Sequence, residues 1–288
     1  MPNFSTLLTK HNITAVAIGH FDGVHRGHKQ LLSRLGEYGG LVVIDKNKAN
    51  ITPKLKRAEY SSYPCFLYEF ESIKDLSGEE FIALLKRDFV NLKRIVVGFD
   101  FRFGRNRAWD KHDLVRIFDA EVIVVDEYCF NGMGVHSSTI REYIKNGEIA
   151  AANALLGREY SIEGEVIKGQ GIGAKELFPT LNLEIKTYLL PHSGVYATRT
   201  RIGNKTYGSV TFIGNRVSTD GAFSVETHII GEQIPPTAER IAVCFVKALR
   251  KNQKFNSLFE LKKQIQKDID QASQYCGVCE LFLGKNER

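Results

Sequence analysis

Apolar and polar positions follow two different spacing patterns along the chain, and the pattern changes near the middle. In the first half, short apolar runs alternate with segments whose apolar residues recur at helical spacing. The runs predicted as buried strands are Ala15–Ile18, Leu41–Ile44, Pro64–Tyr68, Arg94–Val97 and Val122–Val125. Strands that alternate with helices are typical of a parallel, doubly wound sheet, so we predict an α/β Rossmann-like domain.

The helices expected between these strands have recognisable starts and ends. Ser77 and Glu80 have the spacing of a capping box, and Gly157 stands where a glycine commonly ends a helix. The predicted helical segments are Gln30–Leu35, Phe81–Leu85, Asp113–Phe118, Ser137–Ile144 and Gly147–Leu156. We place a domain boundary after the last of them, which gives domains 1–157 and 158–288.

The second half contains short alternating segments separated by Gly, Asn or Pro turns. These segments are Tyr160–Ile167, Leu181–Ile185, Gly194–Thr198, Lys205–Phe212, Ala222–Ile230 and Ile241–Val246. The pattern indicates an antiparallel barrel or sandwich, of which we adopt the barrel. A terminal helix from Ser257 to about Ala272 is expected from the helical spacing of Leu258, Leu261 and Ile265.

Composition narrows the class of protein without naming a function. The 288 residues are 43% hydrophobic and 25% charged, which is ordinary for a soluble globular protein. No apolar run has the length of a membrane span, and Met1–Lys10 does not resemble a signal peptide, so we expect a cytoplasmic protein without membrane contact. The net charge of +6 is spread along the chain, so it does not indicate nucleic-acid binding. The sequence leaves the oligomeric state open.

Cysteine usage argues against both disulfides and structural zinc. The five cysteines have no framework spacing. Cys276 and Cys279 are a close pair, but no second Cys or His pair nearby completes a tetrahedral zinc site. We therefore expect reduced thiols.

The stretch Gly19-His-Phe-Asp-Gly-Val-His-Arg-Gly-His28 joins a predicted strand to a predicted helix. Glycines in such a turn let the backbone approach a ligand, and the first N–H groups of a helix favour an anion. His25 and His28 are three residues apart, so they share one face and can donate hydrogen bonds to phosphate oxygens. The pattern is neither a Walker loop nor a dinucleotide fingerprint.

This stretch resembles the signature of the nucleotidyltransferase superfamily, in particular the N-terminal half of the bacterial bifunctional riboflavin kinase/FAD synthetase family. The resemblance implies that His25 and His28 act in catalysis, transferring an adenylyl group from ATP to FMN with release of pyrophosphate. It implies ATP or phosphate binding by the residues Gly19, Phe21, Asp22, Gly23 and Gly27.

Two further motifs of the first half match the same family. The loop Gly98-Phe-Asp-Phe-Arg-Phe-Gly104 carries aromatic rings that can stack on a flat heterocycle. The resemblance implies that Gly98, Asp100, Phe101 and Arg102 bind the flavin. Ser137-Ser-Thr-Ile-Arg141 can cap a helix, and the resemblance implies that Ser138, Thr139 and Arg141 hold the ATP phosphates.

In the second half, Gly169-Gln-Gly-Ile-Gly-Ala-Lys-Glu-Leu-Phe-Pro-Thr-Leu-Asn182 combines closely spaced glycines with oxygen donors. Successive N–H groups of such a loop form an anion-binding nest, and hydroxyl and amide oxygens suit Mg²⁺. The resemblance to the riboflavin kinase loop implies that phosphates bind Gly169, Gly171, Gly173 and Lys175. It also implies that Mg²⁺ accompanies ATP at Thr180 and Asn182.

A polar face on the segment Ser224–His228 carries Glu226. The resemblance implies that Glu226 is the base that activates the 5′-hydroxyl of riboflavin. It also implies that Arg250 and Phe255, in Leu249-Arg-Lys-Asn-Gln-Lys-Phe255, bind the flavin.

The sequence departs from the family at several positions. Ile44-Asp-Lys-Asn-Lys48 stands where the family has Thr-Phe-x-Pro-His, and Glu176-Leu177 stands before Phe-Pro-Thr. Gly214-Asn-Arg-Val-Ser218 replaces Gly-x-Arg-Pro-Thr, and Asn252 replaces an acid. The expected function is ATP-dependent synthesis of FMN from riboflavin and of FAD from FMN. The alternatives are an enzyme with one active half and a flavin-binding protein without turnover.

Overall fold

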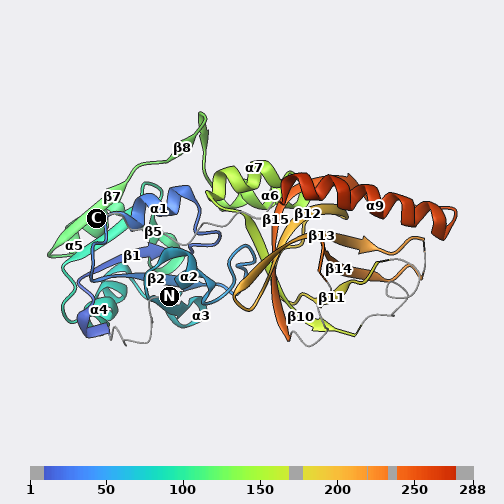
Figure 1. Cartoon of the computed structure of the whole chain (residues 1–288). Helices are drawn as coiled ribbons and strands as arrows, with labels where there is room; N and C mark the ends of the chain where they lie inside the picture. The colour runs from blue at the N-terminus through green and yellow to red at the C-terminus, as the bar shows by residue number, and fades with distance from the viewer. Residues whose placement is uncertain (1–9, 169–177, 219, 233–238, 277–288) are drawn as a thin grey trace, which may run out of the picture. The chain divides into compact units, whose positions relative to one another are not determined.

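The computed structural model describes residues 10–168, 178–218, 220–232 and 239–276 (Figure 1). Contacts divide the chain into two compact units, Met1–Ser137 and Ser138–Arg288, called here the first and the second unit. The division falls earlier in the chain than the predicted boundary at residue 157. Among the described residues, no helix combines the length and the apolar character needed to cross a membrane.

The described part of the first unit is built on a five-stranded parallel sheet in the order β3-β2-β1-β4-β7. Its strands are β1 (Ala15–Gly19), β2 (Gly39–Asp45), β3 (Cys65–Glu69), β4 (Arg94–Gly98) and β7 (Glu121–Val125). Alternate residues of β1 enter two separate apolar cores, one on each face, which is why the strands read as continuous apolar runs. The predicted doubly wound sheet is confirmed.

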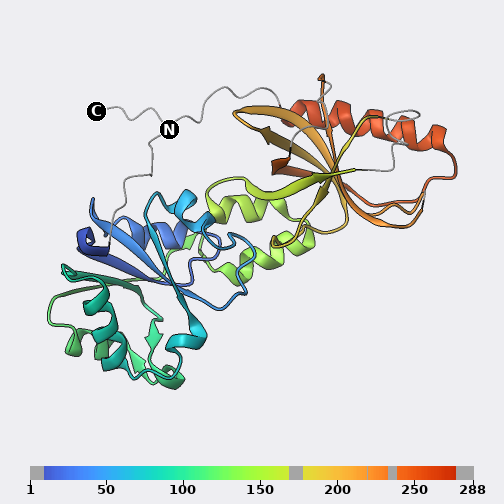
Figure 2. The same cartoon turned by 90° about the horizontal axis from the view of Figure 1, so that it is seen from below.

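Helices and two small hairpins surround this sheet (Figures 1 and 2). The helices are α1 (Arg26–Leu32), α2 (Lys56–Ser61), α3 (Phe70–Ile73), α4 (Gly78–Asp88) and α5 (Lys111–Ile117), with short 3-10 turns at Lys10–Asn12 and Arg105–Arg107. The hairpins are β5 (Arg102–Phe103) with β6 (Trp109–Asp110), and β8 (Cys129–Phe130) with β9 (Met133–Gly134). The predicted capping box is present, because Ser77 and Glu80 each accept a backbone N–H from the other.

The strand order creates a crevice at one edge of the sheet. β1 and β4 are neighbours, but the chain moves outward from β1 to β2 and β3 and returns to the other side for β4 and β7. The loops that follow β1 and β4 therefore diverge at their carboxyl ends. Open α/β sheets bind ligands at such a switch point.

The second unit begins with two helices and continues into a closed barrel with the strand order β10-β11-β14-β13-β12-β15. The helices are α6 (Ser137–Asn146) and α7 (Ile149–Leu156). The strands are β10 (Tyr160–Ile167), β11 (Leu181–Glu184), β12 (Gly194–Ile202), β13 (Lys205–Asn215), β14 (Phe223–Ile229) and β15 (Arg240–Lys251). The barrel is thus confirmed over the sandwich.

Hydrogen bonds between α7 and the barrel explain why α7 groups with the second unit. The side chain of Asn153 donates to the carbonyl of Phe245 at 2.9 Å and accepts the N–H of Tyr160 at 2.7 Å. Gly157 ends α7 in the left-handed conformation, at φ 69°, as predicted.

Hydroxyl groups fill part of the barrel interior. Thr198 Oγ1 lies 2.7 Å from Ser209 Oγ and 2.8 Å from Thr211 Oγ1. The hydrogen bonds continue from Ser209 to Thr200 and from Thr211 to Thr227. All five residues have no exposed surface, so each hydroxyl is satisfied by its neighbours rather than by solvent. Outside the barrel, α9 (Leu258–Tyr275) lies against the barrel wall (Figure 2). It packs there on apolar residues of β12 and β13.

Candidate active sites

A cavity of about 430 Å³ opens in the first unit at the carboxyl ends of its strands. Its wall combines the two loops that sequence analysis places at this edge. The predicted site residues that line it are Gly19, Phe21, His25, Gly27, His28, Gly98, Asp100, Phe101 and Arg102. Residues far apart in the chain are thus gathered around one space.

His25 and His28 lie where the loop that follows β1 joins α1. The imidazole of His25 caps α1, because its Nδ1 accepts the backbone N–H of His28 at 3.3 Å. The two rings are stacked with centroids 3.6 Å apart and an interplanar angle of 20°, as their spacing predicts. His25 is only 5% exposed, so the half-buried His28 is the more accessible of the two.

The absence of a Cβ at Gly27 leaves room for the stacked rings of His25 and His28. A Cβ at this position would come within 3.2 Å of His25 Nδ1 and 3.3 Å of the Val135 carbonyl oxygen. Both distances are shorter than a normal carbon contact. A glycine is needed here for close packing of the histidine.

The turn between β1 and α1 is strained. Phe21 has a φ of 50°, Gly23 of 92° and Val24 of 40°. A positive φ is costly for residues with a Cβ and especially for a β-branched residue. Such a turn persists only where the surrounding structure holds it.

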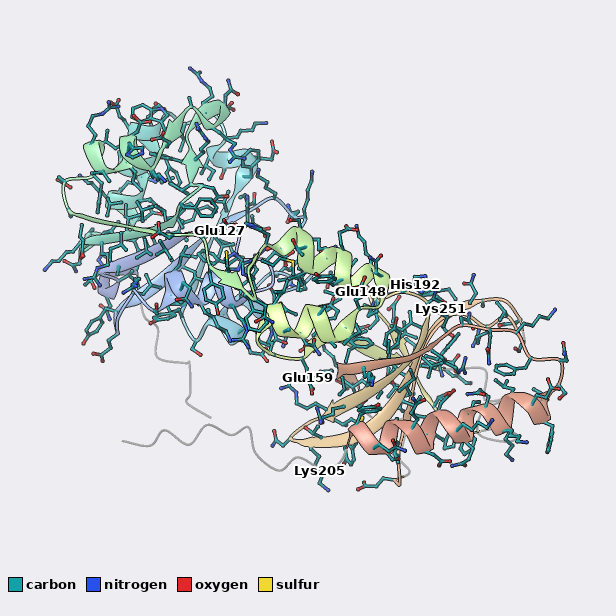
Figure 3. The ribbon with its side chains drawn as sticks, turned by 90° about the horizontal axis from the view of Figure 1, so that it is seen from above. Glu127, Glu148, Glu159, His192, Lys205 and Lys251 are labelled. Atoms are coloured by element: carbon teal, nitrogen blue, oxygen red, sulfur yellow. The ribbon has the colours of Figure 1, made fainter. Side chains whose placement is uncertain are left out.

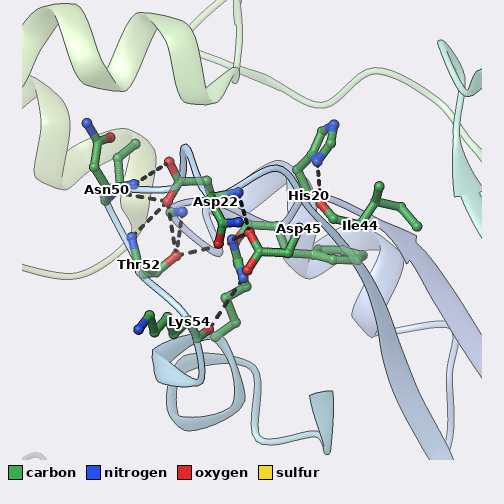
Figure 4. Close-up of polar contacts among 12 residues, drawn as sticks. His20, Asp22, Ile44, Asp45, Asn50, Thr52 and Lys54 are labelled. Atoms are coloured by element: carbon green, nitrogen blue, oxygen red, sulfur yellow. Dashed lines mark hydrogen bonds and ion pairs between the residues drawn. The ribbon is translucent and has the colours of Figure 1, made fainter. Parts of the chain in front are cut away.

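Hydrogen bonds of the Asp22 carboxylate stabilise this turn, and Asp22 does not line the cavity. Its carboxylate accepts backbone N–H groups from Asn50 at 3.2 Å, Ile51 at 3.0 Å and Thr52 at 2.8 Å (Figure 4). Thr52 Oγ1 in turn accepts the N–H of Gly23 at 2.7 Å. Asp22 is 2% exposed and Thr52 fully buried, so these bonds tie the turn to the segment 50–52 away from solvent.

The segment that replaces the family's Thr-Phe-x-Pro-His also reaches the cavity. Ile44 and Lys46 line it, and the Ile44 carbonyl lies 2.7 Å from His20 Nδ1 (Figure 4). Burial lowers the pKa of His20, and Lys46 and other nearby cations lower it further, against the raising effect of the Ile44 hydrogen bond. His20 was not among the predicted site residues.

The loop that follows β4 presents two charges and a stacked pair of rings. Phe101 and Phe103 lie with centroids 5.3 Å apart at 17°. Phe103 is buried, whereas Phe101 is half-buried at the cavity wall, and Asp100 and Arg102 are exposed there.

Several polar residues of the cavity wall are not among the predicted site residues. They are His20, Lys46, Lys74, Arg107, Asp126, Glu127, Tyr128 and His136. Asp126 and Glu127 directly follow β7, and the rule that ligands bind beyond the carboxyl ends of parallel strands would have flagged them. Lys46 and His136 had no comparable signal, because a loop and a short hairpin place them.

Ser138, Thr139 and Arg141 lie in the first turns of α6 and belong to the second unit. The helix starts at Ser137, whose hydroxyl donates to the Asp22 carbonyl within the first unit at 2.7 Å. The role of the three residues on ATP phosphates stays a prediction.

In the second unit, Glu226 lies beside a predicted magnesium ligand. Glu226 of β14 is the register partner of Asn182 of β11, so the two side chains share one face of the barrel wall. Both are half-buried, whereas their neighbours Leu181 and Thr227 point into the barrel. Thr180 is two residues before Asn182 and shares its alternation. The glycine loop that includes Gly169, Gly171, Gly173 and Lys175 lies outside the described residues.

Arg216 holds the carboxylate of Glu226. Its Nη1 donates to Glu226 Oε1 at 3.3 Å, while Nε and Nη2 bond both oxygens of Asp220 at 3.0 and 2.8 Å. Arg216 is the arginine of the segment Gly214–Ser218, which departs from the family pattern. In that segment Ser218 accepts the N–H of Phe255 at 3.0 Å.

His228, also on β14, fixes the segment that leads into β11. Its Nδ1 lies 2.8 Å from the Pro179 carbonyl, and its ring meets Phe178 edge-on at 5.5 Å. Pro179 directly precedes Thr180, so this contact sets the position of the predicted magnesium ligands.

Arg250 and Phe255 lie together near the start of α9. The guanidinium of Arg250 bonds the carboxylate of Asp268 through Nε and Nη2 at 2.8 to 3.1 Å, and its Cζ lies 5.6 Å from the Phe255 ring centroid. Asp268 is only 2% exposed. Arg250 therefore links α9 to β15, and Phe255 beside it is half-buried.

Comparison with known proteins matches two family models to successive parts of the chain. A model of the FAD synthetase family matches residues 8–40 and 44–139, and a model of the riboflavin kinase family matches residues 156–276. The bifunctional riboflavin kinase/FMN adenylyltransferase of Escherichia coli K12 is 29% identical, over 91% of this chain and 93% of its own. The protein of the same name from Buchnera aphidicola subsp. Schizaphis graminum is 32% identical, over 91% and 94%.

A solved structure shares the fold of nearly the whole chain. It is a crystal structure described as a macrolide-efflux protein from Streptococcus pneumoniae, with a TM-score of 0.80 and 26% identity. The match covers 92% of this chain and 95% of that one. The α/β unit and the barrel unit thus both have a counterpart determined by experiment.

Proposed function

Because the chain belongs to the bacterial bifunctional riboflavin kinase/FMN adenylyltransferase family, and so makes FMN from riboflavin and FAD from FMN, we propose which residues carry each step. One observation supports the proposal above the others. Nine of the residues predicted for adenylyl transfer line one cavity in the first unit, and Glu226 and Asn182, both predicted for phosphoryl transfer, are register partners on the barrel.

For adenylyl transfer, the FMN phosphate attacks the α-phosphorus of ATP and pyrophosphate leaves. His28 donates a hydrogen bond to the oxygen on which charge develops, and His25 fixes the His28 ring by stacking. Gly19, Phe21 and Gly27 shape the phosphate side of the cavity, and Ser138, Thr139 and Arg141 hold the leaving phosphates. Gly98, Asp100, Phe101 and Arg102 bind the flavin, with Phe101 as a stacking surface. The step needs no covalent intermediate.

Asp22 and Gly23 take a different part in this proposal from phosphate binding. The Asp22 carboxylate accepts backbone N–H groups of residues 50–52, and the N–H of Gly23 donates to the Thr52 hydroxyl. We assign both to positioning of the turn that carries the histidines.

For phosphoryl transfer, Glu226 accepts the proton of the riboflavin 5′-hydroxyl, whose oxygen attacks the γ-phosphorus of ATP while the bond to the β-phosphate oxygen breaks and ADP leaves. The glycine loop from Gly169 to Lys175 binds the phosphates, and Arg250 and Phe255 bind the flavin. Arg216 orients the Glu226 carboxylate. Phosphoryl transfer needs mainly such positioning, together with neutralisation of the phosphate charge.

Mg²⁺ is the metal that the second unit suits. The side chain of Asn182 offers an amide oxygen beside Glu226, and Thr180 offers a hydroxyl, both hard ligands. When bound with ATP, the ion would neutralise charge on the phosphate oxygens. The described residues contain no cluster of three or more His, Cys, Asp or Glu side chains placed to hold a metal.

The functional boundary is proposed at residue 157, with adenylyl transfer in 1–157 and riboflavin phosphorylation in 158–288. The start of the riboflavin kinase match at residue 156 supports it.

We propose a cytoplasmic location, where ATP is available and thiols such as Cys65 and Cys129 remain free. Riboflavin, FMN and ATP are the proposed partners, without nucleic acid or membrane.

The test is to incubate the chain with riboflavin and MgATP and to separate the flavins by chromatography. Successive appearance of FMN and FAD supports the proposal. FMN alone would mean that the first unit does not turn over, and no product would indicate a binding protein.

A further inference from the structure

Glu127 and His136 form a pair on the cavity wall that the mechanism above does not use. Glu127 Oε1 lies 2.8 Å from His136 Nε2, and the side chains are 42% and 45% exposed. Both residues line the cavity, and Figure 3 labels Glu127 in the segment that leaves the sheet after β7. The carboxylate accepts, so Nε2 carries the proton of this bond.

The β8–β9 hairpin builds the pair. Its ladder joins Cys129 to Gly134, and the N–H of Val135 donates to the Tyr128 carbonyl at 3.0 Å. Glu127 and His136 are the next residues outward on the two arms, so backbone pairing brings their side chains together.

Gly134 leaves the space that the pair occupies. A Cβ at Gly134 would overlap Glu127 Oε1 and lie 2.9 Å from His136 Nε2. The position of the pair therefore depends on this glycine as well as on the hairpin.

Charge is distributed unevenly around the cavity. Lys46 follows β2, and Arg107 belongs to the loop after β4, which carries both signs at Asp100 and Arg102. The segment after β7 instead contributes the neighbouring acids Asp126 and Glu127. Phosphate groups are repelled from that side, which favours an uncharged part of a substrate that donates hydrogen bonds.

We propose that Glu127, oriented by His136, accepts hydrogen bonds from the vicinal 2′- and 3′-hydroxyls of the ATP ribose. The inference rests on the proposed adenylyl transfer in this cavity. A carboxylate accepts only, and the bond from His136 leaves Oε2 and part of Oε1 for two further donors. Two neighbouring hydroxyls match one carboxylate, and an acid beyond a strand's carboxyl end binds ribose hydroxyls in other nucleotide sites. Glu127 thereby selects ribonucleotides.

The experiment measures pyrophosphate release from FMN with ATP, 2′-deoxy-ATP or 3′-deoxy-ATP in the full chain. The parent is expected to prefer ATP to either analogue, because a lost bond to a charged acceptor costs about 10- to 100-fold in kcat/KM. Glu127→Gln is expected to lower kcat/KM for ATP by that factor and to lower it less for 2′-deoxy-ATP or 3′-deoxy-ATP, since each analogue has only one of the two hydroxyl bonds to lose. His136→Ala is expected to lower the preference by a smaller factor, and Glu79→Gln, on the exposed start of α4, to leave it unchanged.

Two results would overturn the proposal while the adenylyl transfer itself stands. One is a parent that forms FAD but uses ATP and 2′-deoxy-ATP equally well. The other is a Glu127→Gln variant that loses FMN affinity, measured by flavin fluorescence, and keeps its preference among nucleotides, since the carboxylate would then bind the flavin's ribityl chain. A parent that releases no pyrophosphate from any nucleotide contradicts the proposed function instead. Unchanged riboflavin phosphorylation together with an unchanged circular dichroism spectrum in each variant shows that both units are folded.

Discussion

The carboxylate of Asp22 accepts the backbone N–H of Thr52 at 2.8 Å, and the hydroxyl of Thr52 accepts the N–H of Gly23 at 2.7 Å. The buried segment thus donates to the strained turn, and the turn donates back to the segment. The conformation of each is therefore stabilised by the other. Sequence similarity implies that Asp22 binds ATP, whereas we propose from these bonds that it positions the turn.

This difference leads to a first prediction. Asp22→Ala leaves the N–H groups of Ile51 and Thr52 buried without an acceptor, which costs about 1–3 kcal/mol for each. We expect a lower free energy of unfolding in denaturant and a loss of FAD formation of more than about tenfold. FMN formation should be unchanged.

Thr52→Val and Thr52→Ser provide the matched comparison. Val removes the hydroxyl and should weaken FAD formation, whereas Ser keeps it and should restore the activity. If Asp22→Ala raises only the KM for ATP and leaves stability at the parent value, Asp22 contacts the nucleotide and the positioning role is wrong.

Gly27 gives a second prediction in which stability and activity separate. Gly27→Ala raises the helix propensity of α1 by up to about 1 kcal/mol, but its Cβ presses on His25. We expect a small change in melting temperature together with a loss of FAD formation of about tenfold or more. Lys29→Ala, on the exposed side of the same helix, is the control. Full activity of Gly27→Ala would show that the position of His25 is not critical.

Arg216 gives a third prediction, for the second unit. Arg216→Met removes the cation that links Glu226 to Asp220, so the carboxylate loses its fixed orientation. We expect kcat/KM for riboflavin to fall about tenfold or more, as positioning effects commonly require, while FAD formation from added FMN is unchanged. A faster kinase in the variant would instead mean that Arg216 restrains the base.

The cysteines give a fourth prediction, on pH. Burial raises the pKa of Cys65 to about 11 and that of Cys244 to about 11. Alkylation requires the thiolate, so at pH 8 the exposed Cys129 should react with iodoacetamide well before either of them. Peptide mapping by mass spectrometry measures the three rates. Equal rates at pH 8 would contradict the burial of Cys65 and Cys244.

The same shifts predict how stability depends on pH. A thiol whose pKa is raised on folding binds its proton more tightly in the folded state. Its contribution is complete below its unfolded-state pKa and is lost as pH rises toward the folded value of about 11. The free energy of unfolding should therefore decrease between about pH 9 and 11.

The architecture followed from local patterns because those patterns have physical causes. Buried parallel strands such as β1 must be apolar throughout, and Gly157 is placed by the conformation that ends α7. His25 and His28 were found because helical spacing alone brings them together. Each of these features depends on residues that are only a few positions apart in the sequence.

Features that depend on distant contacts were not predictable in the same way. Asp22 binds a segment almost thirty positions later, and nothing local distinguishes it from a phosphate ligand. Glu127 and His136 meet through the short β8–β9 hairpin, which sequence analysis did not expect. Arg216 reaches Glu226 across a turn in a segment that departs from the family.

The central claim is that two separate sites process the flavin in sequence, and one measurement tests it most directly. The variants His28→Ala and Glu226→Gln are each given MgATP with riboflavin or with FMN, and the flavins are separated by chromatography. The account predicts that His28→Ala accumulates FMN without FAD, and that Glu226→Gln makes FAD from FMN but no FMN from riboflavin. Equal loss of both steps in both variants would contradict it.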